Sequence, residues 1–268
     1  MTNVFVSVDQ VETPARFIDV RFNLMDKNEG QAQYEKEHIA GAVYFDLERD
    51  LSDMSKKDGR HPMPEKAQLI NLFESAGLQL TDVIYVYDQG GAPFAPRAWW
   101  MLKYAGFENV SIVNGGYDAL KKAGYATTSN KESFDRSTIT ANWQENMYAD
   151  RDYVKAITEG KVDAMLLDAR AAIRYRGEQE PLDPVAGHIP TAKNFDWEQV
   201  KDGNQLVVTE TLRNAVASHK EVVVYCGSGV TASPLYTVLK EAGHENVKLY
   251  VGSYSDWITK YEVATGEE

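Results

Sequence analysis

The residues best suited to chemistry lie in the heptapeptide CGSGVTA, which begins with Cys226, the single cysteine of the chain. A β-branched run over residues 222–225 predicts a buried strand, and apolar residues at helical spacing from Ser233 onward predict a helix. A glycine-containing loop between them can direct several backbone N–H groups at one point beside the positive end of the helix. Because such a loop stabilises an anionic sulfur, we predict that Cys226 is a nucleophilic thiolate rather than a small buried hydrophobic residue.

The composition predicts a globular protein that does not bind nucleic acid. With 268 residues, 43% of them hydrophobic, the chain can bury one large core or two ordinary ones. Its net charge of -12 opposes binding to a phosphate backbone. The first twenty residues lack the basic and apolar regions typical of a signal peptide, no run of about eighteen apolar residues occurs, and one cysteine cannot form an internal disulfide. We therefore expect a cytoplasmic protein with a free thiol and no membrane partner.

Four sequence blocks occur twice in the same order, which indicates an internal duplication. They are FIDVR at 17–21 and LLDAR at 166–170, HIAGAVYFD at 38–46 and HIPTAKNFD at 188–196, VIYVYDQGG at 83–91 and VVVYCGSG at 222–229, and NVSIVNGGYDAL at 109–120 and NVKLYVGSYSDW at 246–257. The residue equivalent to Cys226 in the first half is Asp88, so only the second half carries a nucleophile. His38 and His188 are also equivalent, which favours a shared structural hydrogen bond over a catalytic role.

Each half alternates short β-branched runs with helix-period segments, which predicts an α/β fold of two parallel sheets flanked by helices. The expected strands are 17–20, 42–45, 83–87, 110–113, 164–168, 192–195, 221–225 and 247–250, and the expected helices are 65–76, 94–105, 116–123, 150–159, 209–218 and 232–242. We predict domains at 1–124 and 148–268, joined by a polar linker at 125–147 that Trp143 anchors. Ligands on such sheets bind beyond the carboxyl ends of the strands, where Cys226 is expected.

The duplicated pattern, together with GHIPTAKNF, APRAWW, NGGY and above all CGSGVTA, resembles the two-domain rhodanese family of sulfurtransferases over essentially the whole chain. The CGSGVTA loop is similar to that of the 3-mercaptopyruvate sulfurtransferases, whereas members that prefer thiosulfate usually carry Arg-Lys after the cysteine. The resemblance implies two tandem rhodanese-like domains, the first without a nucleophile. It also implies that a persulfide forms on Cys226 and that the loop residues Gly227, Gly229, Val230 and Thr231 hold the donor and its sulfur.

The implied reaction moves sulfane sulfur from 3-mercaptopyruvate to a thiol, thioredoxin or cyanide acceptor in two steps, without a metal or other cofactor. Arg174 occupies the place of the family's substrate arginine, and a guanidinium suits a carboxylate. His61 matches a histidine that faces the loop hydroxyl, here Ser228, as a proton relay. Glu48, where the family has Asp, is a possible support for the relay.

Two further positions near Arg174 have alternative interpretations. Arg176 is a possible support, with a structural ion pair as the alternative. The family's second substrate arginine aligns with Leu182, so its charge is missing or comes from elsewhere.

Four other functions are alternatives to transfer of sulfur from 3-mercaptopyruvate. Thiosulfate:cyanide sulfurtransferase is the main alternative, and a noncatalytic rhodanese-fold binding module is the second. A Cys-x5-Arg phosphatase requires an arginine where this chain has Ala232. A thiol redox sensor lacks a resolving cysteine.

Overall fold

The computed structural model describes residues 3–267, which fold into two compact units. Unit 1 consists of the chain up to Asp53 together with Pro64–Gln144 and Asp202–Leu206. Unit 2 consists of Met54–Met63, Glu145–Lys201 and the chain from Val207 onward. The units therefore differ from two consecutive segments, because 54–63 packs with the second half of the chain and 202–206 with the first. The outermost residues of the predicted domains, 1 and 268, lie outside the described part.

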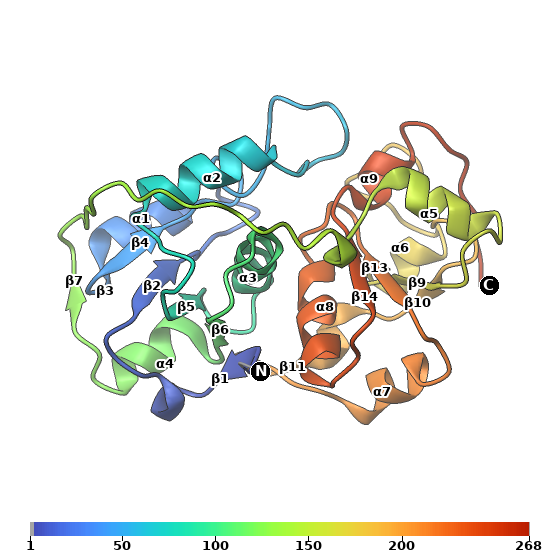
Figure 1. The fold of residues 1–268 in the computed structure, drawn as a ribbon. Coiled ribbons are helices and arrows are strands. Elements are labelled where there is room, and N and C mark those ends of the chain that lie inside the picture. Colours follow the sequence, from blue (N-terminus) through green and yellow to red (C-terminus); the bar gives the residue numbers. More distant parts are fainter. Residues whose placement is uncertain (1–2, 268) are drawn as a thin grey trace. The chain divides into compact units, whose positions relative to one another are not determined.

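Unit 1 is built on a five-stranded parallel sheet with the strand order β1-β6-β5-β2-β4. Its strands are β1 Phe5–Val6, β2 Arg16–Asp19, β4 Ala42–Tyr44, β5 Ile84–Tyr87 and β6 Val110–Val113, and a small antiparallel pair joins β3 His38–Ile39 to β7 Thr127–Thr128. Its helices are α1 Glu29–Lys36, α2 Lys66–Ser75, α3 Phe94–Ala105 and α4 Gly116–Lys122, with a short 3-10 helix, η1, at Val8–Gln10. Figure 1 shows the two sheets with their helices.

Unit 2 repeats this design with a five-stranded parallel sheet in the order β10-β9-β13-β14-β8. Its strands are β8 Tyr148–Ala149, β9 Met165–Asp168, β10 Lys193–Asn194, β13 Val222–Tyr225 and β14 Val247–Tyr250. Its helices are α5 Arg151–Thr158, α6 Ala172–Tyr175, α7 Glu210–Val216, α8 Ala232–Glu241 and α9 Ser253–Trp257, with 3-10 helices η2 Glu145–Met147 and η3 Trp197–Val200. A further two-stranded pair joins β11 Lys201–Asp202 to β12 Gln205–Leu206.

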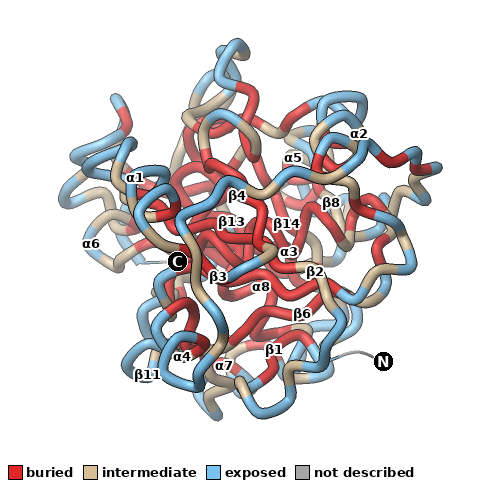
Figure 2. The backbone as a smooth tube through the Cα atoms, turned by 90° about the vertical axis from the view of Figure 1, so that its left-hand side faces the viewer, coloured by how far each residue is buried: buried red, intermediate tan, exposed pale blue. Residues whose placement is uncertain are grey.

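Both cores follow from the alternation of side chains along buried strands. In β13 the side chains of Val223 and Tyr225 join the core cluster that includes α5 and α9, while the alternate residues lie on the other face of the sheet. The four residues of β13 are almost fully buried, and Figure 2 shows β13, β14, β2 and β6 as buried segments. This two-sided burial explains why the strands read as continuous apolar runs.

The predicted α/β architecture is confirmed, and each expected strand and helix has a counterpart within two residues at either end. Short elements such as α1, α6 and the edge strands β1 and β8 were not predicted. In the polar segment that connects the two halves of the sequence, the ring of Trp143 lies 5.1 Å from that of Tyr104 in unit 1. Trp143 therefore anchors this segment to unit 1, as expected.

The duplication preserves a histidine that stacks on a tyrosine ring in each unit. The rings of Tyr34 and His38 lie 3.8 Å apart, and those of Tyr175 and His188 also lie 3.8 Å apart. Nδ1 of each histidine hydrogen-bonds to the carbonyl of its tyrosine, at 2.6 Å for His38 and 2.8 Å for His188. The shared structural hydrogen bond predicted for the two histidines is confirmed.

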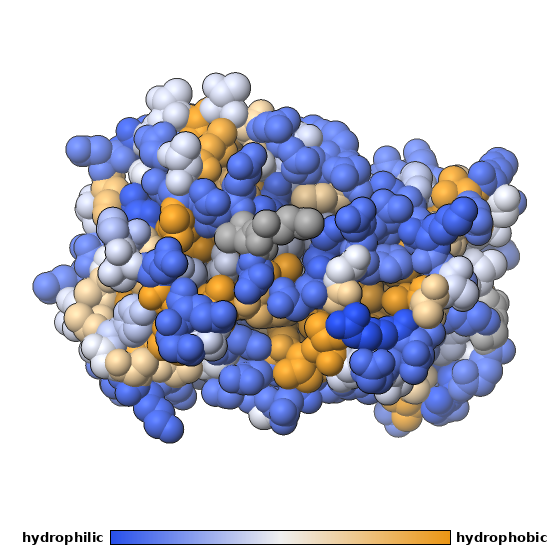
Figure 3. Space-filling view, turned by 60° about the horizontal axis from the view of Figure 1, so that its bottom comes forward, coloured by the Kyte–Doolittle hydropathy of each residue, from blue (hydrophilic) through white to orange (hydrophobic). Residues whose placement is uncertain are grey.

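The face turned toward the viewer in Figure 3 is largely hydrophilic, with scattered apolar residues, as expected for a chain with 25% charged residues. Within residues 3–267, no helix has the length and apolar composition that crossing a bilayer requires.

Candidate active site

Cys226 directly follows β13, the central strand of unit 2, which pairs with β9 on one side and β14 on the other. Its side chain is almost fully buried, and the N–H of Gly229 donates to its Sγ at 3.1 Å. The carbonyl of Cys226 accepts a hydrogen bond from the N–H of Tyr254 at 3.0 Å. The loop therefore fixes the backbone of Cys226 and directs a backbone N–H donor at its sulfur.

Ser253, at the start of α9, holds the other side of this backbone. Its Oγ accepts from the N–H of Cys226 at 3.1 Å, donates to the carbonyl of Tyr250 at 2.8 Å and lies 4.0 Å from Sγ. Ser253 has a φ of 58°, and its equivalent in unit 1 is Gly116 with a φ of 64°. A left-handed backbone in a non-glycine residue costs about 1–3 kcal/mol. Ser253 was not predicted from the sequence as part of the site, although its place opposite a glycine in the aligned repeat was a usable signal.

Two glycines of the loop cannot be replaced without displacing a neighbour. Gly229 has a φ of 73°, and a Cβ there would lie 2.1 Å from the carbonyl oxygen of Val251. A Cβ on Gly227 would lie 2.4 Å from Nη2 of Arg60 and 3.3 Å from Nη2 of Arg174. Gly227 therefore leaves space in front of two guanidinium groups.

The rest of the predicted loop lines the turn into α8. Val230 is buried, and Thr231 immediately precedes Ala232, the first residue of α8. The hydroxyl of Ser233 donates to the carbonyl of Gly229 at 3.1 Å, which ties the helix to the loop.

His61 and Ser228 form a side-chain pair next to the cysteine. Nδ1 of His61 lies 2.8 Å from Oγ of Ser228, and both residues are buried. His61 reaches this position because Met54–Met63 belongs to unit 2. The structure thus brings together the histidine and the hydroxyl that the resemblance paired.

Arg174, on α6, is held by a bidentate ion pair with Glu180. Its Nε lies 3.0 Å from Oε2 and its Nη2 lies 2.7 Å from Oε1 of that carboxylate. Glu180 also accepts from Arg170 at 3.2 Å, and Arg170 makes a buried ion pair with Asp168 at 2.7 Å. Burial opposes ionisation of Glu180, but hydrogen bonds from Arg174 and the backbone of Leu182, with the charges of both arginines, lower its pKa.

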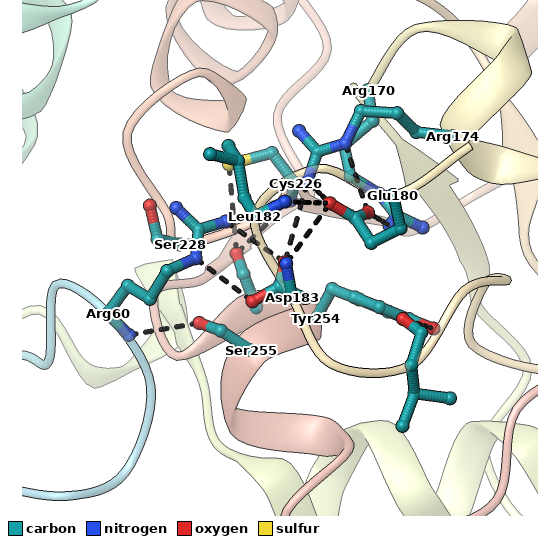
Figure 4. A network of polar contacts seen from close by, with 12 residues as sticks. Arg60, Arg170, Arg174, Glu180, Leu182, Asp183, Cys226, Ser228, Tyr254 and Ser255 are labelled. Carbon is teal, nitrogen blue, oxygen red and sulfur yellow. Dashed lines mark hydrogen bonds and ion pairs between the residues drawn. The ribbon is translucent and has the colours of Figure 1, made fainter. Parts of the chain in front are cut away.

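Arg60 also belongs to this site, although it was not predicted from the sequence. Its Nε lies 2.9 Å from Oδ1 and its Nη2 lies 3.1 Å from Oδ2 of Asp183 (Figure 4). Asp183 Oδ2 also lies 3.4 Å from Nη2 of Arg174. Leu182, where the family's second arginine aligns, is 57% exposed. The position of Arg60 directly before His61 was the only signal in the sequence.

Glu48 and Arg176, predicted as possible supports of the site, form ion pairs with residues outside it. Glu48 belongs to unit 1 and pairs with Lys27 at 2.8 Å, so its support of His61 stays a prediction. Arg176 pairs with Glu178 at 2.7 Å and with Glu267 at 3.5 Å, in the pattern of the structural alternative. Among residues 3–267, no group of three or more His, Cys, Asp or Glu side chains is placed to hold a metal ion.

Comparison with known sequences identifies the family. The sequence model of the rhodanese-like domain matches twice, over residues 8–123 and 150–260. The chain belongs to the rhodanese family. Each match contains four of the five strands of one parallel sheet, so the predicted pair of rhodanese-like domains is confirmed.

Similar members of the rhodanese family carry names of sulfurtransferases. A probable 3-mercaptopyruvate sulfurtransferase of Pseudomonas aeruginosa is 39% identical, over 93% of this chain and 92% of its own length. A putative thiosulfate sulfurtransferase of Mycobacterium tuberculosis is 35% identical, over 92% of this chain and 89% of its own. The crystal structure of a 3-mercaptopyruvate sulfurtransferase from Escherichia coli superimposes with a TM-score of 0.79 at 30% identity, over 95% of this chain and all of that one (100%). The predicted enzyme class, a sulfurtransferase, is confirmed.

In this rhodanese, Asp88 occupies the position in unit 1 that Cys226 occupies in unit 2. Its Oδ1 accepts from the N–H of Gly90 at 2.7 Å and its Oδ2 from that of Ala95 at 3.0 Å. Burial raises the pKa of Asp88 to about 6, although these hydrogen bonds and one from Ala92 lower it. Unit 1 therefore keeps a loop that binds an anion and supplies its own carboxylate to it.

Proposed function

We propose that this rhodanese transfers sulfur from 3-mercaptopyruvate to a thiol, thioredoxin or cyanide acceptor through a persulfide on Cys226. The observation that supports this choice of donor is the 2.8 Å distance between Nδ1 of His61 and Oγ of Ser228. Ser228 lies two residues after Cys226 in the sequence. A histidine–hydroxyl pair can deliver a proton near neutral pH. Mercaptopyruvate needs such a proton, whereas thiosulfate does not.

In the first step, the thiolate of Cys226 attacks the sulfur of the donor. A sulfur–sulfur bond forms, the carbon–sulfur bond breaks, and its electron pair leaves on carbon as the enolate of pyruvate. The carbon then takes up one proton from the hydroxyl of Ser228, which is resupplied by His61. The proton of the donor thiol, carried by the outer sulfur after the transfer, restores the proton of the His61–Ser228 pair and leaves the persulfide as an anion. Gly227, Gly229, Val230 and Thr231 surround the outer sulfur.

In the second step, an acceptor thiolate or cyanide attacks the outer sulfur of the persulfide. The sulfur–sulfur bond breaks, and Cys226 leaves as a thiolate ready for the next donor, which makes the mechanism ping-pong. We place this reaction in the cytoplasm, where a chain with one cysteine stays reduced.

Steady-state transfer to cyanide, measured with both donors, tests the proposal. We expect the larger kcat/KM with mercaptopyruvate, and no turnover of either donor by Cys226→Ser. A larger value with thiosulfate would instead support the activity named for the mycobacterial relative. Full activity of Cys226→Ser would exclude a persulfide on this residue.

A further inference from the structure

We infer that Arg60 and Arg174 together bind the carboxylate of the donor, and that Asp183 is the positioning residue that holds the two guanidinium groups side by side. The inference deepens the proposed function, because it assigns the groups that bind the anionic end of the donor. It also identifies Arg60 as the source of the charge that is missing at Leu182.

The two guanidinium groups face the same point of the nucleophile loop. A Cβ on Gly227 would meet Nη2 of Arg60 at 2.4 Å and Nη2 of Arg174 at 3.3 Å. Gly227 is the next residue after Cys226, so a small molecule whose sulfur contacts Sγ has both cations within reach of its other end. The absence of a side chain at 227 leaves the room that such a molecule needs.

Asp183 joins the two arginines through its buried carboxylate, which is 2% exposed. Arg60 donates to it through Nε and Nη2, at 2.9 and 3.1 Å, and Arg174 approaches Oδ2 at 3.4 Å. The backbone of Arg60 is fixed as well, because its N–H donates to Oγ of Ser255 at 3.1 Å. Figure 4 shows Asp183 between the two arginines, so the spacing of the guanidinium groups is set before a donor arrives.

Both arginines keep donors for a ligand. A guanidinium has five N–H groups, and those of Nη1 in Arg60 and in Arg174 make no hydrogen bond to any residue in the range 3–267. Their side chains are 31% and 18% exposed, so a dissolved molecule can reach them. A carboxylate is the group that matches the flat fork of a guanidinium.

The ion-pair network around the two arginines has no net charge, which favours a ligand with a single negative charge. Three guanidinium groups and three carboxylates balance one another in it, namely those of Arg60, Arg170, Arg174, Asp168, Glu180 and Asp183. A monocarboxylate adds one charge to this neutral network, whereas a dianion such as thiosulfate adds two beside the carboxylates already there. The network therefore favours a 2-oxo monocarboxylate.

The donor preference of Asp183→Asn provides the first test. We expect the KM for mercaptopyruvate to rise about threefold to tenfold, because the arginines lose their common partner, while the removed negative charge lowers the KM for thiosulfate. Opposite changes for the two donors cannot result from partial unfolding. Glu210→Gln, which removes a carboxylate paired with the exposed Arg213 in the same unit, is the matched control and should change neither KM. Equal losses with both donors in Asp183→Asn would overturn the positioning role.

Binding of pyruvate to Cys226→Ser provides the second test, and it does not depend on turnover. We expect Arg60→Ala, made in this background, to weaken pyruvate binding in an NMR titration by roughly tenfold to a hundredfold. Arg60→Lys should recover part of the affinity, since it keeps the charge and loses the fork. Unchanged pyruvate affinity in Arg60→Ala would overturn the inference whichever donor the wild type prefers. If thiosulfate proves the better donor while pyruvate binding still depends on Arg60, the proposed donor is wrong and the carboxylate site stands.

Discussion

Nδ1 of His61 lies 2.8 Å from Oγ of Ser228, although the two residues are 167 positions apart in the sequence. If this pair delivers the proton that the enolate needs, His61→Ala should lower kcat with mercaptopyruvate by about a hundredfold or more, the usual size of general acid catalysis. Thiosulfate turnover should fall much less, because sulfite requires no proton on carbon. Single-turnover formation of pyruvate measures the first effect directly.

The exposed His219 on the same unit provides the control for this substitution. His219→Ala should leave both donors unaffected. Equal losses with both donors in His61→Ala would indicate that His61 supports the loop and does not relay a proton.

Arg174→Ala should raise the KM for mercaptopyruvate by roughly tenfold to a hundredfold, because it removes charge-assisted hydrogen bonds to the donor. The fold should survive, since α6 lies at the surface and the Arg174 side chain is 18% exposed. Steady-state kinetics and a thermal unfolding curve distinguish the two effects. Arg213→Ala, at an exposed arginine of α7, should leave the KM unchanged, and an unaltered KM in Arg174→Ala would remove this residue from the site.

Ser253 allows backbone strain and catalysis to be separated. Ser253→Gly should relieve about 1 kcal/mol of strain at a φ of 58°, while the lost acceptor for the N–H of Cys226 lowers kcat several-fold. Ser253→Ala keeps the strain and loses the same acceptor. We therefore expect similar kcat values for the two variants but a lower melting temperature for Ser253→Ala. Equal melting temperatures would show that the left-handed backbone stores little energy here.

Asp88 predicts a pH dependence of stability in the first unit. Its pKa rises from 3.8 to about 6 on folding, chiefly through burial, so the folded state holds the proton more tightly than the unfolded state. Its contribution to the free energy of unfolding is complete below the unfolded pKa and is lost as the pH rises through about 6, a change of about 3 kcal/mol.

Urea unfolding of the wild type and of Asp88→Asn at about pH 4.5 and about pH 7.5 measures this term. The stability of the wild type relative to the variant should decrease at the higher pH, because the amide does not titrate. A difference between the two proteins that is the same at both pH values would contradict the prediction.

The strands and the position of Cys226 at the end of one of them could be predicted because their signals are local. A strand such as β13 is buried on both faces, and Cys226 follows it within a loop whose glycines have few other uses. The aligned repeat then distinguished the half with a cysteine from the half with Asp88.

The rest of the site depends on contacts between distant segments, which no local pattern reports. Arg60 meets Asp183 across 123 positions, and the segment that carries it has neither a helical nor a strand period. Helix α1 was not predicted, for a different reason. It buries only Gly30 and Tyr34, so it lacks the apolar stripe by which a surface helix is recognised.

The carboxylate of Asp88 occupies the loop of unit 1 that corresponds to the Cys226 loop of unit 2. It occupies the N–H groups of Gly90 and Ala95, and its attachment to the chain gives it an effective concentration that a dissolved anion does not match. We therefore expect sulfite, thiosulfate and other small anions not to bind in the first loop at neutral pH. Cys226 is the single cysteine and the proposed site of the persulfide, so mass spectrometry after treatment with excess donor should find one added sulfur and no second.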